Sequence, residues 1–507
     1  MNETATTEQR LPGPTQLGRS SPGSDPGAVT HKKTTGRFWF LLAINVFLAI
    51  GLFTSQTNQA AGLWAVGLMV AMMLLGVSVG IALSLASVAG LFHVSSTAAV
   101  VNVLSSAPFS ASSKWSMSVL PMFILMGFLL TQAGLTQRLY RATYIWFGWL
   151  PGGLAIGTTA AGAGLSAVSG STIGMTYTLG RAGIPEMLKV GYDRRVAVGS
   201  ILTGGLAGQL IPPSIILVVY AGVVSVPVGP QLLAGVVPGL AISAMFALLF
   251  LALGLVFPKL MGRGKDAPTA QRDISWRERF TSILGLWGLP LIMLVLFGGL
   301  FTGYFTPTEA GAAAAFMSVL LTMYYTRRSQ PVHQIAKALV QTARATAAIF
   351  LILIGAEMLT RMLAVTGIAG TVTDFIVELG LPRFGFLVAL IIFYIFLGMF
   401  FDTMSMILLT VPLLMPALDF YDVNLIWFGV FIVILGEIGM ITPPVGVLAY
   451  ITYNLTKDRE INQGVKITLN DVFMAILWFL PFAVLFLIIL IFWPDLATWL
   501  PSISSAT

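Results

Sequence analysis

The residues of this sequence that could do chemistry are oxygen-bearing side chains set inside apolar stretches. One group is the run Ser169-Gly170-Ser171-Thr172, and another is Asp402-Thr403, which follows apolar residues from Gly398 onward. Hydroxyl, carboxylate and carbonyl oxygens are the ligands that hard cations take in proteins. A carboxylate within an apolar span usually marks an ion or substrate path. The two groups therefore indicate binding of an ion or a polar substrate.

Each group also has a purely structural interpretation. Asp402 could cap the N-terminus of a helix, where Asp is among the preferred residues. The small residues around Ser169 could simply let two helices pack closely. Covalent catalysis by Ser169 or Ser171, as in an intramembrane serine protease, would need a histidine base within a span. The three histidines of the chain fall in expected tails or loops, so this chemistry is not supported.

Two apolar stretches are interrupted by glycine and a pair of prolines. Gly205-x-x-Gly208-x-x-Ile211-Pro212-Pro213 recurs as Gly436-x-x-Gly439-x-x-Thr442-Pro443-Pro444, a shift of 231 residues from Pro212 to Pro443. Proline breaks the helical hydrogen-bond ladder. At bilayer depth such a break is tolerated only where protein or a water-filled cavity covers the freed backbone groups. The same shift places Ser171 opposite Asp402, so we expect an internal duplication with a binding region at each break.

The composition is that of a polytopic helical membrane protein. Of the 507 residues, 57% are hydrophobic and 9% are charged, whereas a soluble domain carries about 25% charged residues. The mean hydropathy is +0.90. Apolar runs of roughly 20 residues, the length of a spanning helix, recur along the chain, and the alternating pattern of an outer-membrane barrel is absent. The chain has no Cys, which excludes a thiolate nucleophile and a cysteine-ligated metal.

The basic residues set the expected orientation in the membrane. All of the 27 Lys and Arg residues except Lys114, Arg361 and Arg383 are assigned to one side. By the positive-inside rule that side is cytoplasmic. This placement explains the formal net charge of +7 without a nucleic-acid partner. The N-terminus is then expected in the cytoplasm and the C-terminus on the opposite side of the membrane.

The chain is expected to consist of a tail, an extra helix and two similar halves. The expected segments are a disordered cytoplasmic tail at 1–36, an extra N-terminal transmembrane helix at 37–61, a first repeat at 62–257, a cytoplasmic loop at 258–281, a second repeat at 282–495 and a C-terminal tail at 496–507. The first repeat contains a hairpin at 151–190 and a broken helix at 193–225. The second contains a hairpin at 383–418 and a broken helix at 424–455.

The hairpins predict how the halves are related. Each has two apolar arms that are short for a span of roughly 20 residues, so each is expected to be re-entrant with its tip in mid-membrane. The expected topology brings the hairpin at 151–190 from the inside and the hairpin at 383–418 from the outside. The halves are therefore predicted to be inverted repeats, as in secondary transporters with a midplane site between the repeats. Residues 62–94 are expected to form two short helices that meet near Gly76.

Several motifs, taken together and in order, resemble one family. They are Ser-Gly-Ser at 169–171, Ile-Pro-Pro-Ser at 211–214, Phe-Thr-Pro-Thr-Glu-Ala at 305–310, Gly-Met-Phe-Phe-Asp at 398–402 and Ile-Thr-Pro-Pro-Val-Gly at 441–446. From about Gly62 to Pro501 the chain resembles the large membrane subunit, of DctM/SiaM type, of tripartite ATP-independent periplasmic (TRAP) transporters.

The resemblance implies an elevator-type importer that uses a Na⁺ gradient to bring organic acids across the bacterial inner membrane, and therefore a transporter rather than an enzyme. It also implies two protein partners besides membrane lipid. One is a small four-helix membrane subunit, and the other is a periplasmic substrate-binding protein.

The resemblance and the oxygen-rich chemistry together select the candidate site residues. The candidates for Na⁺ binding are Ser169, Gly170, Ser171, Gly208, Pro212, Gly398, Asp402, Gly439, Thr442 and Pro443. The candidates for substrate binding are Ser171, Thr172, Ser214, Asp402 and Thr403. No cofactor and no metal other than Na⁺ is expected. Gln209 and Thr403 stand where the family often has proline.

Three further acidic residues have separate interpretations. Glu437 lies within the second broken helix and is either a site carboxylate or a buried hydrogen-bond partner. Glu309 follows Pro307 and is expected to stabilise the N-terminus of a helix through its dipole. Glu357 and Arg361 are spaced for an i,i+4 pair on one helix.

Two other functions are alternatives. A stand-alone Na⁺/carboxylate symporter of related inverted-hairpin architecture would work without a binding protein. A channel or passive membrane scaffold belongs to a different class and would not need two matched hairpins with Asp402. Direct drive by ATP is not supported, because the phosphate-binding motif G-x-x-x-x-G-K-[ST] is absent from the chain.

Overall fold

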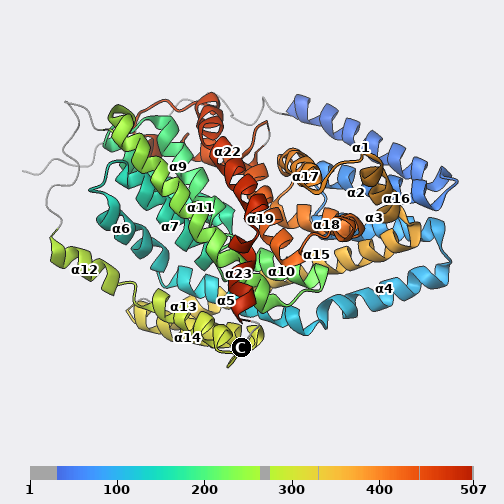
Figure 1. Ribbon diagram of the computed structural model, residues 1–507, viewed down its shortest axis with the longest axis horizontal. Helices are drawn as coiled ribbons and strands as arrows, with labels where there is room; N and C mark the ends of the chain where they lie inside the picture. The colour runs from blue at the N-terminus through green and yellow to red at the C-terminus, as the bar shows by residue number, and fades with distance from the viewer. Residues whose placement is uncertain (1–30, 263–274, 329, 445, 505–507) are drawn as a thin grey trace, which may run out of the picture.

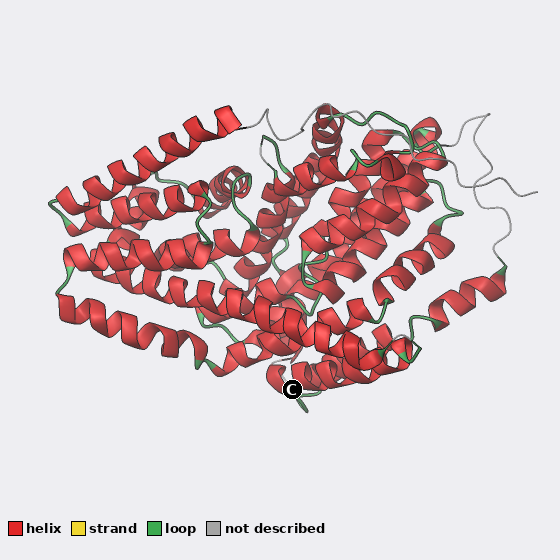
Figure 2. Cartoon of the chain, turned by 180° about the vertical axis from the view of Figure 1, so that it is seen from behind, coloured by secondary structure: helices red, strands yellow, loops and turns green. Residues whose placement is uncertain are grey.

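A computed structural model describes residues 31–262, 275–328, 330–444 and 446–504 of the chain. Most of the expected tail at 1–36 lies outside these residues, as do the side chains of 31–35, 37 and 166–169. Every regular element in the described part is a helix (Figures 1 and 2). The predicted all-α class is confirmed.

The first helices form a bundle around the long helix α15 (Pro331–Thr366). α1 (His31–Thr54) packs on α2 (Asn58–Leu75), and α15 contacts both α3 (Val79–Val94) and α4 (Thr97–Ser112). A buried apolar cluster joins these helices and includes Leu52, Met69, Leu83 and Met362. The expected extra helix at 37–61 covers most of α1, which begins at His31 and ends at Thr54, and also the first residues of α2.

The predicted break near Gly76 is confirmed. α2 ends at Leu75, and α3 begins at Val79. Between them Gly76 has φ +98°, a left-handed conformation that glycine adopts without the steric cost of a Cβ atom. Residues 62–94 therefore form two helices rather than one long span.

The first hairpin and the first broken helix follow in the order that the sequence predicts. The helices from here to the middle loop are α5 (Val119–Gln132), α6 (Leu135–Phe147), α7 (Gly153–Ser169), α8 (Thr172–Lys189), α9 (Arg194–Leu206), α10 (Ile215–Val224) and α11 (Val228–Val256), with short 3₁₀ turns at Trp115–Ser118 and Pro258–Leu260. α7 and α8 form the hairpin, and α9 and α10 are the two parts of the interrupted helix.

The second half has the same order. After α15 its helices are α16 (Ile368–Glu378), α17 (Arg383–Gly398), α18 (Thr403–Phe420), α19 (Leu425–Ile441), α20 (Val447–Leu455), α21 (Arg459–Asn462), α22 (Leu469–Phe492) and α23 (Asp495–Ser504); before α15 lie α12 (Trp276–Leu284), α13 (Gly288–Phe301) and α14 (Pro307–Thr326). α17 and α18 form the second hairpin, and α19 and α20 the second interrupted helix.

The helix bounds repeat at the shift seen in the sequence. α8 runs from Thr172 to Lys189 and α18 from Thr403 to Phe420, so the shift of 231 residues that relates Thr172 to Thr403 also relates their last residues. The packing repeats too. Each hairpin packs on the first part of its own interrupted helix, α9 or α19, while α10 packs on α18 and α20 on α8. The second part of each interrupted helix therefore packs on the hairpin of the other half, and α10 and α18 lie side by side near the middle of Figure 1.

The chain is a multi-pass membrane protein. Six helices of the described part are long and apolar enough to cross a membrane, and up to eight if each of two bent pairs counts as one span. The bent pairs are α12 with α13, at 49°, and α16 with α17, at 119°. α12 and α16 are therefore strongly inclined to the helices that follow them, as helices lying at a membrane interface would be.

Two segments are more helical than expected. The expected loop at 258–281 contains the start of α12. The expected tail at 496–507 contains α23, which packs on α11 and α19 through the buried Ala497 and Pro501. Burial of these short apolar patches is a tertiary effect that the local sequence does not reveal.

Asp471 connects the start of α22 to the start of α9. Its carboxylate lies 3.0 Å from Arg194 Nε and 3.6 Å from Arg195 Nε, and its side chain is only 3% exposed. Thr468 completes a capping box with the same carboxylate.

We expect Asp471→Ala to lower the free energy of unfolding by about 1–3 kcal/mol, the range for leaving a buried hydrogen-bonding group unpartnered. Thermal unfolding in detergent measures the change. Asp471→Asn retains much of the cap and loses the charge, so its midpoint should lie between those of Asp471→Ala and the unmodified protein. An unchanged midpoint for Asp471→Ala would contradict the expectation.

Candidate functional site

The second helix of each hairpin starts at a polar cap. The Ser171 hydroxyl accepts a hydrogen bond from the Gly174 amide at 3.2 Å and caps α8. The Asp402 carboxylate accepts from the amides of Met404 and Ser405, at 3.1 and 3.2 Å, and caps α18. The Ser405 hydroxyl donates to it as well. The structural interpretation of Asp402 is therefore confirmed, and it leaves a role in binding open.

Thr172, the first residue of α8, is held by the first interrupted helix. Gln209 Nε2 donates to the Thr172 hydroxyl oxygen at 2.9 Å. Both side chains are buried, at 2% and 3% exposure. Gln209 lies between α9 and α10, where the helix is broken. The break in the first interrupted helix therefore brings the Gln209 side chain into contact with the tip of the first hairpin.

Thr403, the first residue of α18, makes the corresponding contact in the second half. Its hydroxyl donates to Glu437 Oε1 at 3.1 Å, and both residues are 1% exposed. Each hairpin tip therefore places a buried threonine hydroxyl against a polar side chain of an interrupted helix, Thr172 at Gln209 and Thr403 at Glu437.

Two glycines allow this close approach. A Cβ atom on Gly205 would lie 2.8 Å from Thr172 Cγ2, and a Cβ atom on Gly436 would lie 2.4 Å from Thr403 Cγ2. The two glycines are related by the same shift as the two threonines. Because no larger residue fits at either position, the glycines of the repeated motif place a threonine against each interrupted helix.

The two breaks differ in length. Residues 207–214 separate α9 from α10, and Ser214 caps α10 by accepting from the Leu217 amide at 3.2 Å. α19 continues to Ile441, and Thr442 follows as its C-terminal cap, with its hydroxyl donating to the Ile438 carbonyl at 2.6 Å. The Pro212-Pro213 and Pro443-Pro444 bonds are both cis.

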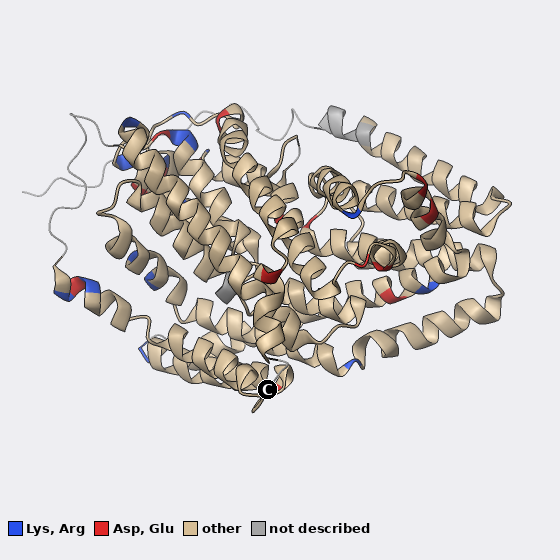
Figure 3. Cartoon of the chain, viewed as in Figure 1, with Lys and Arg blue, Asp and Glu red and all other residues tan. Residues whose placement is uncertain are grey.

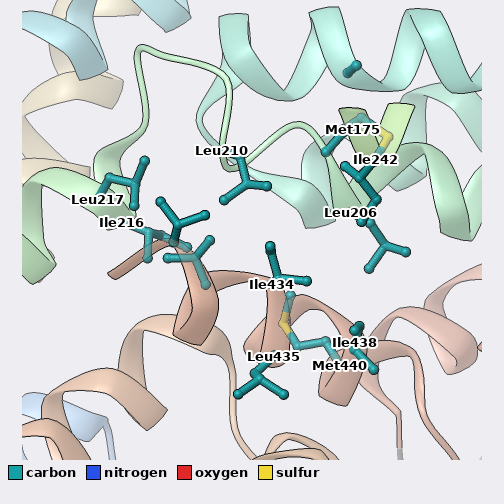
Figure 4. Close-up of a cluster of buried hydrophobic side chains, with 14 of the residues drawn as sticks. Met175, Leu206, Leu210, Ile216, Leu217, Ile242, Ile434, Leu435, Ile438 and Met440 are labelled. Atoms are coloured by element: carbon teal, nitrogen blue, oxygen red, sulfur yellow. The ribbon is translucent and has the colours of Figure 1, made fainter. Parts of the chain in front are cut away.

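An apolar cluster surrounds the breaks. Figure 4 shows Leu206, Leu210, Ile216 and Leu217 of the first half near Ile434, Leu435, Ile438 and Met440 of α19. Polar groups enclosed by such side chains interact more strongly than they would in water, and an unpartnered one is costly. The polar contacts at the hairpin tips are therefore the main interactions available to any ion or polar ligand there.

Two buried oxygens next to the hairpin tips, Glu437 Oε2 and Gln209 Oε1, make no hydrogen bond with any of the described residues. Buried polar atoms of proteins are nearly always partnered. The two acceptors, together with the hydroxyls of Thr172 and Thr403, are hard oxygen donors of the kind that suit a small cation. We define these four residues as the central polar cluster.

A cavity of about 310 Å³ lies beside the tip of the first hairpin. Ser171, Gly174 and Thr178 of α8 line one side, and residues of α5 and Gln341 of α15 line the other. Its polar groups are hydroxyls and amides, among them Gln132, whose Nε2 donates to Gln341 Oε1 at 3.1 Å. Its volume falls in the range of small-ligand sites, which begins at about 300 Å³.

The predicted site residues fall into three groups. Ser171, Thr172, Asp402 and Thr403 lie at the hairpin tips, and Gly170, with φ +61°, is the turn of the first tip, near Ile215 of α10. Gly208, Pro212, Ser214, Thr442 and Pro443 lie in or beside the breaks, while Gly398 and Gly439 pack against each other. The Ser169 side chain lies outside the described part.

Gln209 was not among the candidates, and Glu437 was left between two interpretations. The signal for both was a polar side chain within a span that is otherwise apolar. The structure shows that each binds a hairpin threonine.

Two smaller predictions are confirmed. Glu309 and Thr306 form a capping box at the start of α14, with Glu309 Oε2 accepting from the Thr306 amide at 2.8 Å. Arg361 NH2 lies 3.4 Å from Glu357 Oε1 on α15. Glu309 caps a helix and Glu357 forms an ion pair, and among the described residues neither has a hydrogen bond or ion pair with the central polar cluster.

The chain matches one family model over most of its length. The model is described as the tripartite ATP-independent periplasmic transporter, DctM component, and it matches residues 66–496. α1 lies outside the matched range.

Curated relatives cover nearly the same residues. The chain is 31% identical over 457 residues to the C4-dicarboxylate TRAP transporter large permease protein DctM of Vibrio cholerae, covering 86% of this chain and 96% of the relative. It is 29% identical to the ectoine TRAP transporter large permease protein TeaC of Halomonas elongata, over 81% of this chain and 94% of the relative. It is 25% identical to the sialic acid TRAP transporter permease protein SiaT of Haemophilus influenzae, over 92% and 71%.

A solved structure shares the fold. The YdaH transporter of Alcanivorax borkumensis superposes with a TM-score of 0.54 and 13% identity, covering 80% of this chain and 89% of that one. At this identity the likeness concerns the fold alone.

Proposed function

The chain belongs to the DctM component family of tripartite ATP-independent periplasmic transporters, which makes it a TRAP transporter large permease subunit, and we propose that it couples import of an organic acid to entry of Na⁺. The relatives are named as permeases, and we propose that this chain likewise moves its substrate without changing it chemically. The relatives named for C4-dicarboxylates support the organic-acid class.

One observation supports Na⁺ most strongly: the central polar cluster. Glu437 Oε2 and Gln209 Oε1 are buried acceptors without a partner among the described residues, and Asp402 directly precedes Thr403, whose hydroxyl binds Glu437. Two neighbouring carboxyl groups in an apolar surrounding repel each other when ionised, and a cation between them relieves that repulsion. Na⁺ at this place would hold the two hairpin tips together.

The substrate is proposed to bind beside the tips. The cavity next to Ser171 has room for a small molecule, and the N-terminal ends of α8 and α18 start at Thr172 and Thr403. Helix N-termini carry partial positive charge, which suits the carboxylate of an organic acid. In this proposal the substrate and the ion share the tips, so that each favours the binding of the other.

The matching helix bounds and the exchanged packing of the two halves support inverted repeats and an elevator mechanism. Here α7 to α10 and α17 to α20 form the mobile unit, and the bundle around α15 with the arms α6 and α16 forms the fixed scaffold. The proposed location is the bacterial inner membrane, with the N-terminus in the cytoplasm and the C-terminus in the periplasm. The proposed partners are a small four-helix subunit and a periplasmic binding protein.

Uptake in liposomes tests the proposal. The subunit is reconstituted with its two partners, and uptake of a labelled organic acid is followed with and without an inward Na⁺ gradient. Asp402→Asn is the informative variant, because Asn caps helices as well as Asp does but carries no charge.

We expect Asp402→Asn to keep the thermal stability of the unmodified protein and to lower Na⁺-driven uptake roughly 10- to 100-fold, the equivalent of one interaction with a charged group. Equal uptake with and without the Na⁺ gradient would contradict the proposal. An Asp402→Asn variant that transports as well as the unmodified protein would also contradict it.

A further inference from the structure

A basic groove lies between helices α6 and α12, away from the hairpin tips. It has a volume of about 220 Å³ and is lined by Arg138, Arg141, Ile145, Glu278, Thr281, Ser282 and Gly285. Two arginines face a single carboxylate, so the groove carries an excess of positive charge. Figure 3 shows Lys and Arg along α6 and α12, at the end of the molecule opposite to α1.

The two arginines are only partly satisfied. Arg141 NH2 lies 3.7 Å from Glu278 Oε1, and both side chains are largely exposed, at 75% and 48%. The Arg138 guanidinium lies over the Tyr325 ring, 4.8 Å from its centre, and makes no ion pair among the described residues. An exposed pair at 3.7 Å is weak, and a planar guanidinium is suited to bind phosphate oxygens in a bidentate manner. The groove therefore fits a phosphate group.

Aromatic and apolar residues next to the groove show what the phosphate would belong to. Trp146 Nε1 donates to the Arg279 carbonyl at 3.2 Å, and Arg279 itself stacks on Trp276, at 4.9 Å. Tryptophans of this kind gather at the level of lipid headgroups. On α12, Phe280 and Leu284 are 58% and 66% exposed. A free inorganic phosphate has no apolar part that could pack against this face, whereas a phospholipid has acyl chains.

We infer that the groove between α6 and α12 binds the phosphate headgroup of an anionic phospholipid, whose acyl chains lie along Phe280 and Leu284. Arg138 and Arg141 hold the phosphate, and Thr281 and Ser282, whose hydroxyls donate to the carbonyls of Glu278 and Arg279, line the edge of the groove. Basic pockets between helices on the cytoplasmic side are known to take such headgroups. The bound lipid would join α6, in the first half, to α12 at the start of the second.

Lipid titration of the purified full chain in detergent tests the inference. Phosphatidylglycerol is the probe, phosphatidylcholine is the neutral lipid, and inorganic phosphate is the soluble source of the same chemistry. Native mass spectrometry reports bound lipid. We expect phosphatidylglycerol to bind in clear preference to the other two, and the double variant R138Q/R141Q to bind it more than tenfold more weakly, at about fivefold for each arginine.

Two further variants separate the groove from general effects of charge and folding. Arg277 lies on the same helix and is exposed, but it does not line the groove. Arg277→Gln should therefore weaken the binding of phosphatidylglycerol by no more than the roughly fivefold effect of one surface arginine, and by less than the double variant does. Glu278→Gln removes the competing carboxylate and should bind phosphatidylglycerol more tightly, a gain that misfolding does not produce.

The inference is overturned if R138Q/R141Q binds phosphatidylglycerol as the unmodified protein does, or if Arg277→Gln weakens binding as much as the double variant. It is also overturned if Glu278→Gln weakens binding. Equal binding of phosphatidylcholine would exclude the anionic headgroup, and displacement by inorganic phosphate at matched concentration would assign the groove to a free anion instead.

Discussion

Replacing Glu437 by glutamine is expected to lower Na⁺-driven uptake by about 10- to 100-fold while the protein stays folded. Glutamine keeps the volume of the side chain and an acceptor for the Thr403 hydroxyl, which lies 3.1 Å from Glu437 Oε1. It loses the negative charge of the carboxylate. Hydrogen bonds to charged groups contribute about 1.5–3 kcal/mol, and each 1.4 kcal/mol is a factor of ten in affinity.

The measurement is uptake in liposomes at increasing Na⁺ concentration, together with the thermal midpoint. If the carboxylate binds Na⁺, Glu437→Gln should raise the Na⁺ concentration for half-maximal uptake. If Glu437 were only a hydrogen-bond partner, the variant would transport normally with an unchanged Na⁺ dependence, and the central polar cluster would not be the ion site. Glu309→Gln is the matched control, because Glu309 is exposed and glutamine also completes a capping box.

Gly398→Ala is expected to disrupt the second hairpin and to reduce uptake to a small fraction. A Cβ atom on Gly398 would lie 2.7 Å from the Gly439 Cα atom, and one on Gly439 would lie 2.6 Å from the Gly398 Cα atom. Neither contact is with a side chain that can turn away, so α17 and α19 have to separate. Overpacking of this kind costs about 1–3 kcal/mol.

The separation would also disturb the contact between Thr403 and Glu437, since Thr403 follows α17 closely and Glu437 lies on α19. Thermal unfolding in detergent and liposome uptake measure the two effects. Gly298→Ala is the control: Gly298 lies in helix α13 with nothing within 4 Å of a Cβ atom, and alanine favours a helix over glycine by up to about 1 kcal/mol. Equal behaviour of the two variants would contradict the expectation.

Much of the fold could be predicted from local signals. The break at Gly76, the gap between α9 and α10 and the end of α19 near Thr442 follow from glycine and proline, which act on the backbone where they stand. The caps at Ser171, Thr306 and Asp402 follow from side chains that bind the nearest free amides. Helix ends that depend on burial were not predicted, as α23 shows by packing on α11.

The candidate site was predicted only in part. The oxygen-rich tips were visible as residues, and so was the repeat that relates Thr172 to Thr403. The partner of each threonine was not. The sequence shows Gln209 only as a departure from the usual proline and allows both a binding and a structural role for Glu437, because each contacts a residue more than thirty positions away in the chain.

The sequence by itself determined where this chain breaks its helices, where its hairpins turn and which family it resembles. These properties depend on residue types at short spacing, and they leave the same trace in both halves. Only the tertiary structure decided that Thr172 binds Gln209 and that Thr403 binds Glu437, while one buried oxygen of Gln209 and one of Glu437 make no hydrogen bond among the described residues. The physical reason is that α19 packs both on the second hairpin and on α9 and α10 of the first half, and such packing between distant parts of the chain is not contained in any local pattern.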